Sequence, residues 1–408
     1  MDDSVNTKAI TLPGNASRNA VTLSVCNALF ICSISIDLSL TGITGFQLAP
    51  TPSLATLPFA LITLAGAVTT YFAAGIIQRM GSKFGFIFGA LVGAVGGLVS
   101  VISVLNQNFW MFCAGTAAVG VWQAFAQYYR LAAADAVSSE YKAKAISGVL
   151  AGGLIAAILG PLLATSSKDF FDDGFFAGAY LVVAALSLLT IFILLLFYRD
   201  MPLTSSVGST KNAPTVLRSR RAILKQPVFL AAAANNAVGG MVMMLIMTAA
   251  PLAAMTCGYS VDQGASVIQW HLVGMYAPSF FAGKLINKYG LSKILYCGMA
   301  LNLISVTIAA NSVSLTGFHT ALFILGVGWN FMFVGGSILL AQSYREGEQA
   351  KAQGMGEFLR FAATAIGALV AGPTLEGLGW SSLNLVALPF IGLAFGLTIW
   401  WRRAQPTV

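Results

Sequence analysis

Residues 74–83 read AGIIQRMGSK, and residues 283–293 read GKLINKYGLSK. When the two stretches are aligned, Gly81 falls on Gly290 at the end of an apolar run. A repeat of this kind, far apart in one chain, indicates the internal symmetry from which many transporters are built.

Further pairs match in the same order and at nearly the same offset. Asn27–Ala28 falls on Asn236–Ala237, Trp122–Gln123 on Trp329–Asn330, Ala143–Ala145 on Ala350–Ala352, and Gly160–Pro161 on Gly372–Pro373. Each match is weak alone, but together they predict two related halves.

The composition places both halves in a membrane. Of the 408 residues, 57% are apolar and 9% are charged, and the mean hydropathy is +0.80. Apolar runs of about 20 residues, long enough to cross a hydrocarbon core of about 30 Å as helices, recur along the whole chain. Outer-membrane barrels show alternating segments of about 10 residues instead.

We expect an all-α integral membrane protein with twelve spans in two pseudo-symmetric six-helix bundles. The spans are predicted at 20–46, 54–78, 84–105, 109–132, 145–165, 175–198, 228–256, 262–285, 293–312, 316–341, 352–373 and 382–401. The predicted domains are an N-terminal bundle with a short tail (1–198), a cytoplasmic central loop (199–227) and a C-terminal bundle (228–408).

The basic residues predict the orientation. With twelve spans and the N-terminus inside, every Lys and Arg except Lys168 falls on the cytoplasmic side or at the adjoining helix ends. Positive charge favours that side, so we expect a multi-pass protein of the cell (inner) membrane with both termini in the cytoplasm.

These features resemble the major facilitator superfamily, and the resemblance covers the whole chain. The family's loop signature after the second helix, Gly-x-x-x-Asp-Arg-x-Gly-Arg-Lys, is matched here by Ala74, Gln78, Arg79, Gly81 and Lys83. The resemblance implies transport by alternating access. It also implies conformational gating by Arg79, Gly81 and Lys83 and by their counterparts Lys288 and Gly290.

The chain departs from this signature at its acidic position, which is Gln78 in the first half and Asn287 in the second. An amide forms only neutral hydrogen bonds, so we expect a softer latch than a charge pair. The fifth span contains Gly160 and Pro161, which resemble the Gly-Pro motif of drug/proton antiporters and imply a further gating element.

The fourth span carries the clearest polar stripe. Gln123 and Gln127 are four residues apart and share one helical face, and Trp122 precedes them. Family members line a central cavity with this helix, so the predicted substrate cavity consists of Trp122, Gln123, Gln127, Trp329, Asn330, Asn27 and Asn236. Helix packing and hydrogen bonding between helices are the alternative roles for these residues. The nearby methionines Met241, Met243, Met244 and Met247 indicate adaptable packing.

Two titratable residues are candidates for proton coupling. Asp37 is the only acid deep inside a span, and an ionised carboxylate there needs a partner, water or a proton path. His271 lies in the eighth span and titrates near neutral pH. Either residue also suits a structural role. Glu357 and Arg360, three residues apart, form either a gate or a surface ion pair at the cytoplasmic rim.

The sequence therefore predicts a secondary transporter for a small organic solute. We expect no enzyme, since neither HExxH nor GxSxG is present, and no direct ATP drive, since GxxxxGK[ST] is missing. Export of amphipathic compounds, towards which the Gly-Pro element leans, and uptake of a flat aromatic nutrient such as a riboflavin-like vitamin both stay open. A membrane assembly factor or sensor is a further alternative. We expect no cofactor, metal or nucleic-acid partner, and a monomer surrounded by lipid.

Overall fold

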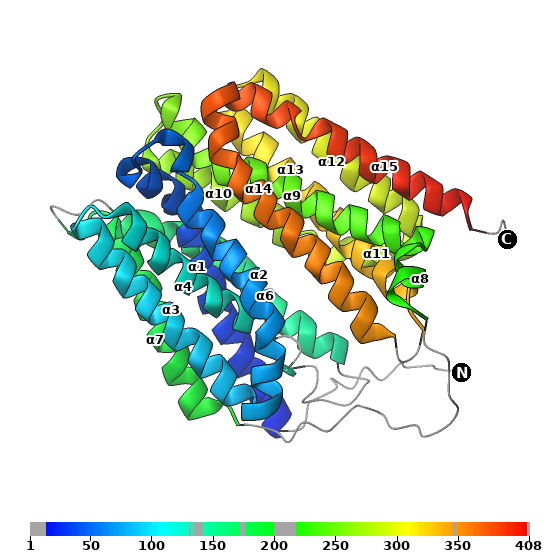
Figure 1. The fold of residues 1–408 in the computed structure, drawn as a ribbon, viewed down its shortest axis with the longest axis horizontal. Coiled ribbons are helices and arrows are strands. Elements are labelled where there is room, and N and C mark those ends of the chain that lie inside the picture. Colours follow the sequence, from blue (N-terminus) through cyan, green and yellow to red (C-terminus); the bar gives the residue numbers. More distant parts are fainter. Residues whose placement is uncertain are drawn as a thin grey trace, which may run out of the picture.

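The computed structural model describes residues 14–129, 132–133, 142–171, 176–199, 218–345 and 348–405. Regular structure within these ranges is entirely helical, and two bundles of helices lie side by side (Figure 1). The expected all-α fold with twelve spans in two bundles is confirmed, although several predicted bounds differ from those of the helices.

The first bundle contains six spans and a short 3-10 helix. They are α1 (Gly14–Leu48), η1 (Pro52–Leu54), α2 (Leu57–Met80), α3 (Ser82–Leu105), α4 (Phe109–Ala126), α6 (Lys142–Ser167) and α7 (Ala177–Phe197). Helix α8 (Arg220–Leu224) precedes the second bundle.

The second bundle contains the other six spans. Its helices are α9 (Pro227–Thr256), α10 (Val261–Tyr276), α11 (Ser279–Tyr289), α12 (Leu291–Asn311), α13 (Leu315–Gln342), α14 (Gln349–Leu385) and α15 (Leu388–Arg403). The eighth span is broken into α10 and α11, and α14 bends sharply at Gly379, where φ is 73°. Residues 382–385, which the sequence placed in the twelfth span, therefore lie in α14 beyond that bend, and α15 begins at Leu388.

The repeated stretches 74–83 and 283–293 have nearly the same backbone dihedrals at their shared glycine. Gly81 joins α2 to α3 with φ 90° and ψ 155°, and Gly290 joins α11 to α12 with φ 90° and ψ 148°. These dihedrals are essentially restricted to glycine, so both helix junctions require the residue that the sequence supplies there.

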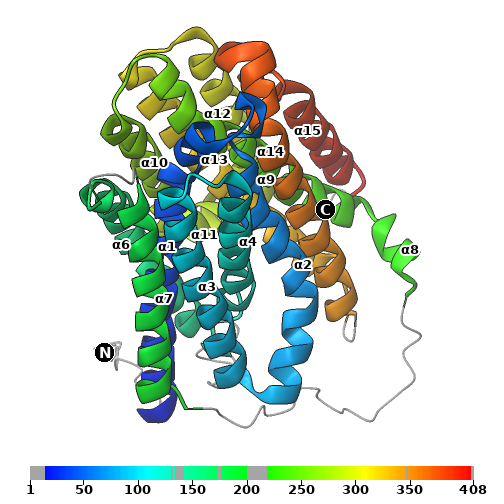
Figure 2. The same ribbon diagram turned by 60° about the vertical axis from the view of Figure 1, so that its left-hand side comes forward.

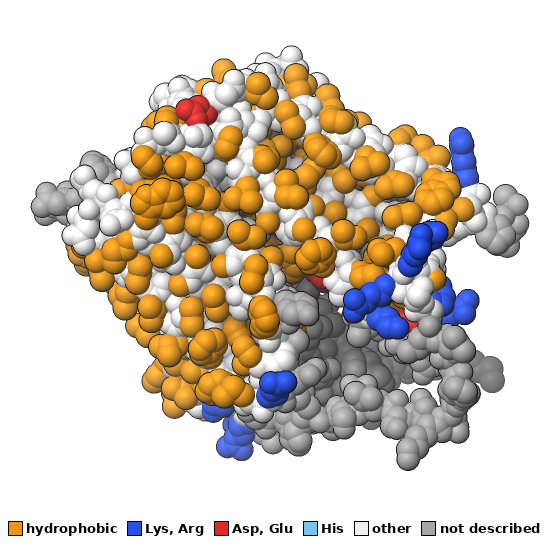
Figure 3. Space-filling model, in the orientation of Figure 1, with side chains coloured by type: hydrophobic (Ala, Val, Ile, Leu, Met, Phe, Trp, Pro, Cys, Tyr) orange, Lys and Arg blue, Asp and Glu red, His pale blue; other side chains and the backbone are white. Residues whose placement is uncertain are grey.

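Lipid-facing surfaces are apolar, as the space-filling view shows (Figure 3). Helix α3 exposes a stripe with spacings of three and four residues, made by Phe84, Phe88, Leu91, Val95, Leu98 and Ile102. Its glycines lie on the other face, where Gly89 and Gly93 contact Phe125 and Trp122 of α4. One face of α3 is thus suited to contact with lipid, and its opposite face packs closely against α4.

The two ends of the molecule differ in charge. One end, here called the basic end, carries Arg79, Lys83, Lys288, Arg402 and Arg403, and blue side chains gather there (Figure 3). The opposite end carries η1, Lys168, Asp262 and Glu376. In a view turned by 60°, η1 and the start of α2 lie beside α14 at that opposite end (Figure 2).

Candidate functional site

A cavity of about 130 Å³ lies between the two bundles. Its described lining residues are Phe30, Ile31, Ile34, Ser35, Leu38, Phe59, Ile62, Thr63, Gln123 and Gln127 from the first bundle and Met243, Met244, Met247, Leu272, Met275 and Tyr276 from the second. Pockets for drug-sized ligands usually measure about 300–1,000 Å³. A solute too large for this cavity therefore requires the two bundles to move apart.

The wall from the first bundle carries the amides. Gln123 and Gln127 both line the cavity from α4, so the face predicted from their spacing is the face that the helix presents. The Oε1 atom of Gln123 is buried and has no hydrogen-bond partner. It lies against Gly66 of α2, where an added Cβ would be 3.3 Å away.

The second bundle lines the cavity with four methionines, one leucine and one tyrosine. Met243, Met244 and Met247 lie on α9, while Met275 and Tyr276 end α10. Thioethers adapt to irregular shapes and contact aromatic rings favourably. Of the four methionines that the sequence indicated as packing, Met243, Met244 and Met247 line the cavity, and the described lining does not include Met241. Met275 and Tyr276 were not predicted.

Tyr276 owes its position to the break in the eighth span. Pro278 lacks a backbone N–H and cannot continue the hydrogen-bond ladder of α10. Asn330 holds the break, since its Nδ2 donates to the Met275 carbonyl at 2.8 Å and to Ser279 Oγ at 2.6 Å. The Asn330 amide group thus forms its hydrogen bonds within the second bundle, and the described cavity lining does not include it.

Trp122 also lies away from the cavity, contrary to the placement expected from sequence. Its side chain is completely buried, and its Nε1 donates to the Tyr129 hydroxyl at 3.3 Å. Its ring meets Phe30, a lining residue, edge to face at 5.5 Å. Trp122 therefore supports the wall from behind.

Trp329 is partly buried and stacks on Phe333, with ring centroids 4.9 Å apart and planes 9° from parallel. The described lining of the cavity does not include it. The Arg360 guanidinium lies 5.8 Å from the Phe333 ring and 4.1 Å from the Phe361 ring. Trp329 thus begins a row of aromatic and cationic side chains on α13 and α14.

Asn27 and Asn236, the other predicted cavity residues, are buried at 8% and 4% exposure. Neither belongs to the described cavity lining. The Asn236 Oδ1 atom faces α13, where an added Cβ on Gly336 would lie too close to it. Asn236 therefore faces the interior of the second bundle.

Asp37 is buried on α1 within the first bundle. Thr41 Oγ1 donates to its Oδ1 at 3.3 Å, and its Oδ2 has no hydrogen-bond partner. Tyr180 of α7 donates to Thr44 Oγ1 at 2.9 Å and lies 3.4 Å from Thr41 Oγ1. The acid thus belongs to a chain of hydroxyl groups between α1 and α7 and lies outside the described cavity lining.

His271 is completely buried on α10. Its Nδ1 lies 2.7 Å from the Leu322 carbonyl of α13, and its Nε2 has no partner. A carbonyl can only accept, so Nδ1 carries a proton. This contact joins two helices of one bundle.

The predicted gating residues are spread over both bundles. Arg79 is exposed in the last turn of α2, Lys288 is exposed in α11, and Lys83 Nζ donates to the Leu195 carbonyl at 3.0 Å. Gly160 lets α6 approach α1, since an added Cβ would lie 2.3 Å from Cβ of Ser35; Pro161 follows it within the helix. The placement of the Gln78 side chain lies outside what the structure describes.

Glu357 and Arg360 form an ion pair within α14, with Nε of Arg360 at 2.9 Å from Oε2 of Glu357. The Arg360 side chain is 16% exposed and that of Glu357 is 39% exposed. Arg360 is therefore more enclosed than a residue on a free surface, because its stem lies near Gly240 and its head lies against aromatic rings.

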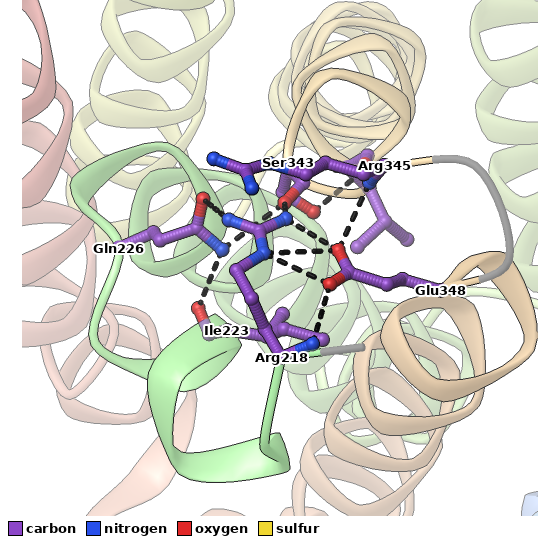
Figure 4. Close-up of polar contacts among 7 residues, drawn as sticks. Arg218, Ile223, Gln226, Ser343, Arg345 and Glu348 are labelled. Carbon is purple, nitrogen blue, oxygen red and sulfur yellow. Dashed lines mark hydrogen bonds and ion pairs between the residues drawn. The ribbon is translucent and has the colours of Figure 1, made fainter. Parts of the chain in front are cut away.

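A second polar cluster, unforeseen from the sequence, lies at the basic end (Figure 4). Arg218 Nε donates to both carboxylate oxygens of Glu348 at 3.0 Å, and its other nitrogens reach Gln226 and the Ser343 carbonyl. The backbone N–H groups of Arg218 and Arg345 also donate to Glu348. The cluster anchors the segment before α9 to the connection between α13 and α14.

These contacts set the charge of Glu348. The hydrogen bond from Arg218 is the main cause that lowers the pKa of Glu348 to about 2, and it raises the pKa of Arg218. Both groups are therefore charged across the physiological range.

Known proteins match this chain over nearly its whole length. The model of the Major Facilitator Superfamily matches residues 23–278 and 265–408. The riboflavin transporter RfnT of Brucella anthropi is 37% identical over 382 residues, which cover 93% of this chain and 94% of the relative. The uncharacterized MFS-type transporter YddS of Bacillus subtilis is 26% identical over 368 residues, 86% of this chain and 84% of the relative.

The fold has a counterpart among solved structures. The nucleoside transporter NupG superposes with a TM-score of 0.68 at 14% sequence identity, covering 96% of this chain and all of that one. At this identity the likeness concerns the fold alone. With the family match and the 37% identical relative, it leads to one conclusion: the chain belongs to the major facilitator superfamily and is a membrane transporter of small solutes.

Proposed function

We propose that this transporter carries riboflavin or a closely related flat heteroaromatic compound. The observation that carries the proposal is the 37% identity, over 93% of the chain, to a protein named as a riboflavin transporter. Of the two solute classes that the sequence left open, this similarity supports the vitamin-like one over the drug-like one suggested by Gly160 and Pro161.

The cavity chemistry is consistent with such a solute. Phe30 and Phe59 supply aromatic rings, the methionines of α9 supply soft apolar contacts, and Gln123 and Gln127 supply hydrogen bonds. Sites for flat organic ligands are typically apolar with a few placed polar groups. The amides belong to one bundle and the methionines to the other, so a bound solute would touch both moving parts.

The proposed mechanism couples transport to protons through Asp37. Loss of its proton would leave a buried charge without a counter-charge among its described contacts, which is unfavourable. Gain or loss of the proton would also rearrange the hydrogen bonds of Thr41 and Tyr180 between α1 and α7. His271 is a second candidate, but its contact with Leu322 already gives it a structural role.

The proposed setting is the cell (inner) membrane, with a monomer embedded in lipid and the basic end in the cytoplasm. The clustering of Arg and Lys at that end supports this orientation, because positively charged loops are retained on the cytoplasmic side. We further propose that the helix junctions at Gly81 and Gly290 act as hinges during gating. Arg79, Lys83 and Lys288 lie beside these junctions.

Transport of radiolabelled riboflavin into proteoliposomes tests the proposal. We expect saturable accumulation that empty liposomes lack, followed in both directions by loading the compound inside or outside. Met244→Trp should reduce it at least about tenfold by filling the cavity, whereas Met80→Trp, on a side chain that is 55% exposed, should not. Absence of riboflavin transport by the wild-type protein would overturn the proposal.

A further inference from the structure

Gln123 lies on the last turn of α4, and Gln127 is the C-cap residue that follows this helix. The Gln127 N–H donates to the Gln123 carbonyl at 3.2 Å, so the backbone between them is helical. Side chains four residues apart on a helix lie one above the other, with Cβ atoms about 5–6 Å apart. Both line the cavity, so two carboxamides face it from adjacent turns.

The pair has unused hydrogen-bonding capacity. Gln123 Oε1 is buried without a partner, and a buried amide oxygen is stabilised when a donor reaches it. Each carboxamide also carries an NH₂ group with two donors. Together the two side chains offer donor, acceptor and donor groups along one wall of the cavity.

The absence of charged side chains from the described lining restricts the class of ligand. Within the described lining, Tyr276 is the sole titratable residue, and Lys, Arg, His, Asp and Glu are missing from it. A carboxylate, phosphate or ammonium group would be buried there without a counter-charge, which is unfavourable. The recognised edge of the solute is therefore neutral.

We propose that Gln123 and Gln127 bind the imide edge of the solute's ring, a carbonyl, an N–H and a second carbonyl in a row. One glutamine carbonyl accepts from the imide N–H, and the two NH₂ groups donate to the flanking carbonyls. The methionines on α9 and Met275 contact the face of the ring from the other bundle. This inference rests on the proposed function, because riboflavin carries such an edge, and it names the part of the molecule that is read.

The geometry gives Gln123 the central role. Its Oε1 is the buried, unpartnered acceptor, and Gly66 leaves room beside it, since any side chain at position 66 would approach the amide at 3.3 Å. Gln127, one turn nearer the basic end, completes the edge. A donor–acceptor pair formed by an amide typically discriminates between matched and mismatched ring edges by about five- to 150-fold.

The test compares two ligands, riboflavin and riboflavin methylated at the imide nitrogen. Titration calorimetry measures the affinity of the purified protein for each. The wild-type protein should bind riboflavin at least about tenfold more tightly than the methylated compound. Gln123→Leu should bring this ratio close to one, mainly by weakening riboflavin. Gln342→Leu, on an exposed residue at the end of α13, should keep the wild-type ratio.

The outcomes separate the two proposals. Equal binding of both compounds by the wild-type protein overturns the imide inference and leaves riboflavin transport intact. Failure of the wild-type protein to bind riboflavin overturns the proposed function and the inference with it. The wild-type ratio tests the inference even if a glutamine variant is unstable. Preserved discrimination in a folded Gln123→Leu protein, checked by thermal unfolding, also contradicts the inference.

Discussion

The Nζ atom of Lys168 lies 2.9 Å from Oδ1 of Asp262, and this ion pair joins the two bundles at the end opposite the basic end. Lys168 follows α6 and Asp262 begins α10. The Gly372 N–H of α14 also donates to Thr56 Oγ1 beside α2, at 2.9 Å. The structure is therefore held together at this end.

The ion pair should favour the state that is closed at this end. Asp262→Asn removes it, and exposed pairs contribute about 0.2–1 kcal/mol, so the closed-to-open ratio should fall by about 1.4- to fivefold. The Asp262 hydrogen bond raises the pKa of Lys168, so the ammonium is charged at neutral pH and loses its proton only when the pH rises above that pKa. High salt should reduce the effect.

Spin labels at Ser166→Cys and Gln263→Cys, in a protein whose exposed Cys257 and Cys297 are replaced by serine, would report this shift through distances measured by electron paramagnetic resonance. Asp169→Asn is the matched control, because Asp169 lies 3.4 Å from the same ammonium but in the same bundle. A distance distribution that responds equally to both variants, or to neither, argues against a latch between the bundles.

Asp37→Asn should uncouple transport from the proton gradient. The amide keeps the size of the side chain but cannot lose a proton, so accumulation driven by a pH gradient should disappear while solute exchange persists. Ser39→Ala, which removes another buried polar group of α1, should leave driven accumulation intact. Transport into proteoliposomes with and without a pH gradient makes the comparison, and unchanged driven accumulation in Asp37→Asn would remove Asp37 from the mechanism.

The cluster at Arg218 and Glu348 should stabilise the fold down to low pH. Its contribution is present above the ordinary glutamate pKa of 4.5 and is lost as the pH falls through the lowered value of about 2. Glu348→Gln should therefore lower Tm at pH 7 and equally at pH 5. The difference from wild type should shrink between about pH 4.5 and 2.

Thermal unfolding in detergent across this pH range provides the measurement. Glu376→Gln is the matched control, since this glutamate lies at the opposite end and has no ion pair among the described residues. A difference that already disappears between pH 7 and 5 would show that the charge of Glu348 is not what stabilises the cluster.

The sequence predicted the spans well because a bilayer requires a long apolar run for each helix. It also predicted the face of α4, since residues 123 and 127 lie four apart on a helix. The same geometry explains why the described cavity lining includes Gln123 but not Trp122: neighbouring residues point about 100° apart on a helix. Trp329 and Asn330 both lie outside the described lining, Trp329 because it stacks on Phe333 and Asn330 because it binds the end of α10.

Other features depend on contacts that no local pattern contains. Arg218 and Glu348 are 130 residues apart, and only the packing of α8 against the start of α14 brings them together. Tyr276 reaches the cavity because α10 ends there and Asn330 holds the broken backbone. The Ala277–Pro278 dipeptide was the available signal, since proline interrupts helices.

The two tryptophans aligned by the repeat should differ in what they support. Trp122 is fully buried and hydrogen-bonded to Tyr129, so Trp122→Ala should destabilise the protein by about 3–5 kcal/mol. Trp329 is partly exposed, so Trp329→Ala should cost clearly less. Trp122→Phe, which keeps a ring behind Phe30, should recover most of the stability and nearly all solute binding. Thermal unfolding and calorimetric titration of the three variants check this order, and equal losses of stability in the two alanine variants would contradict it.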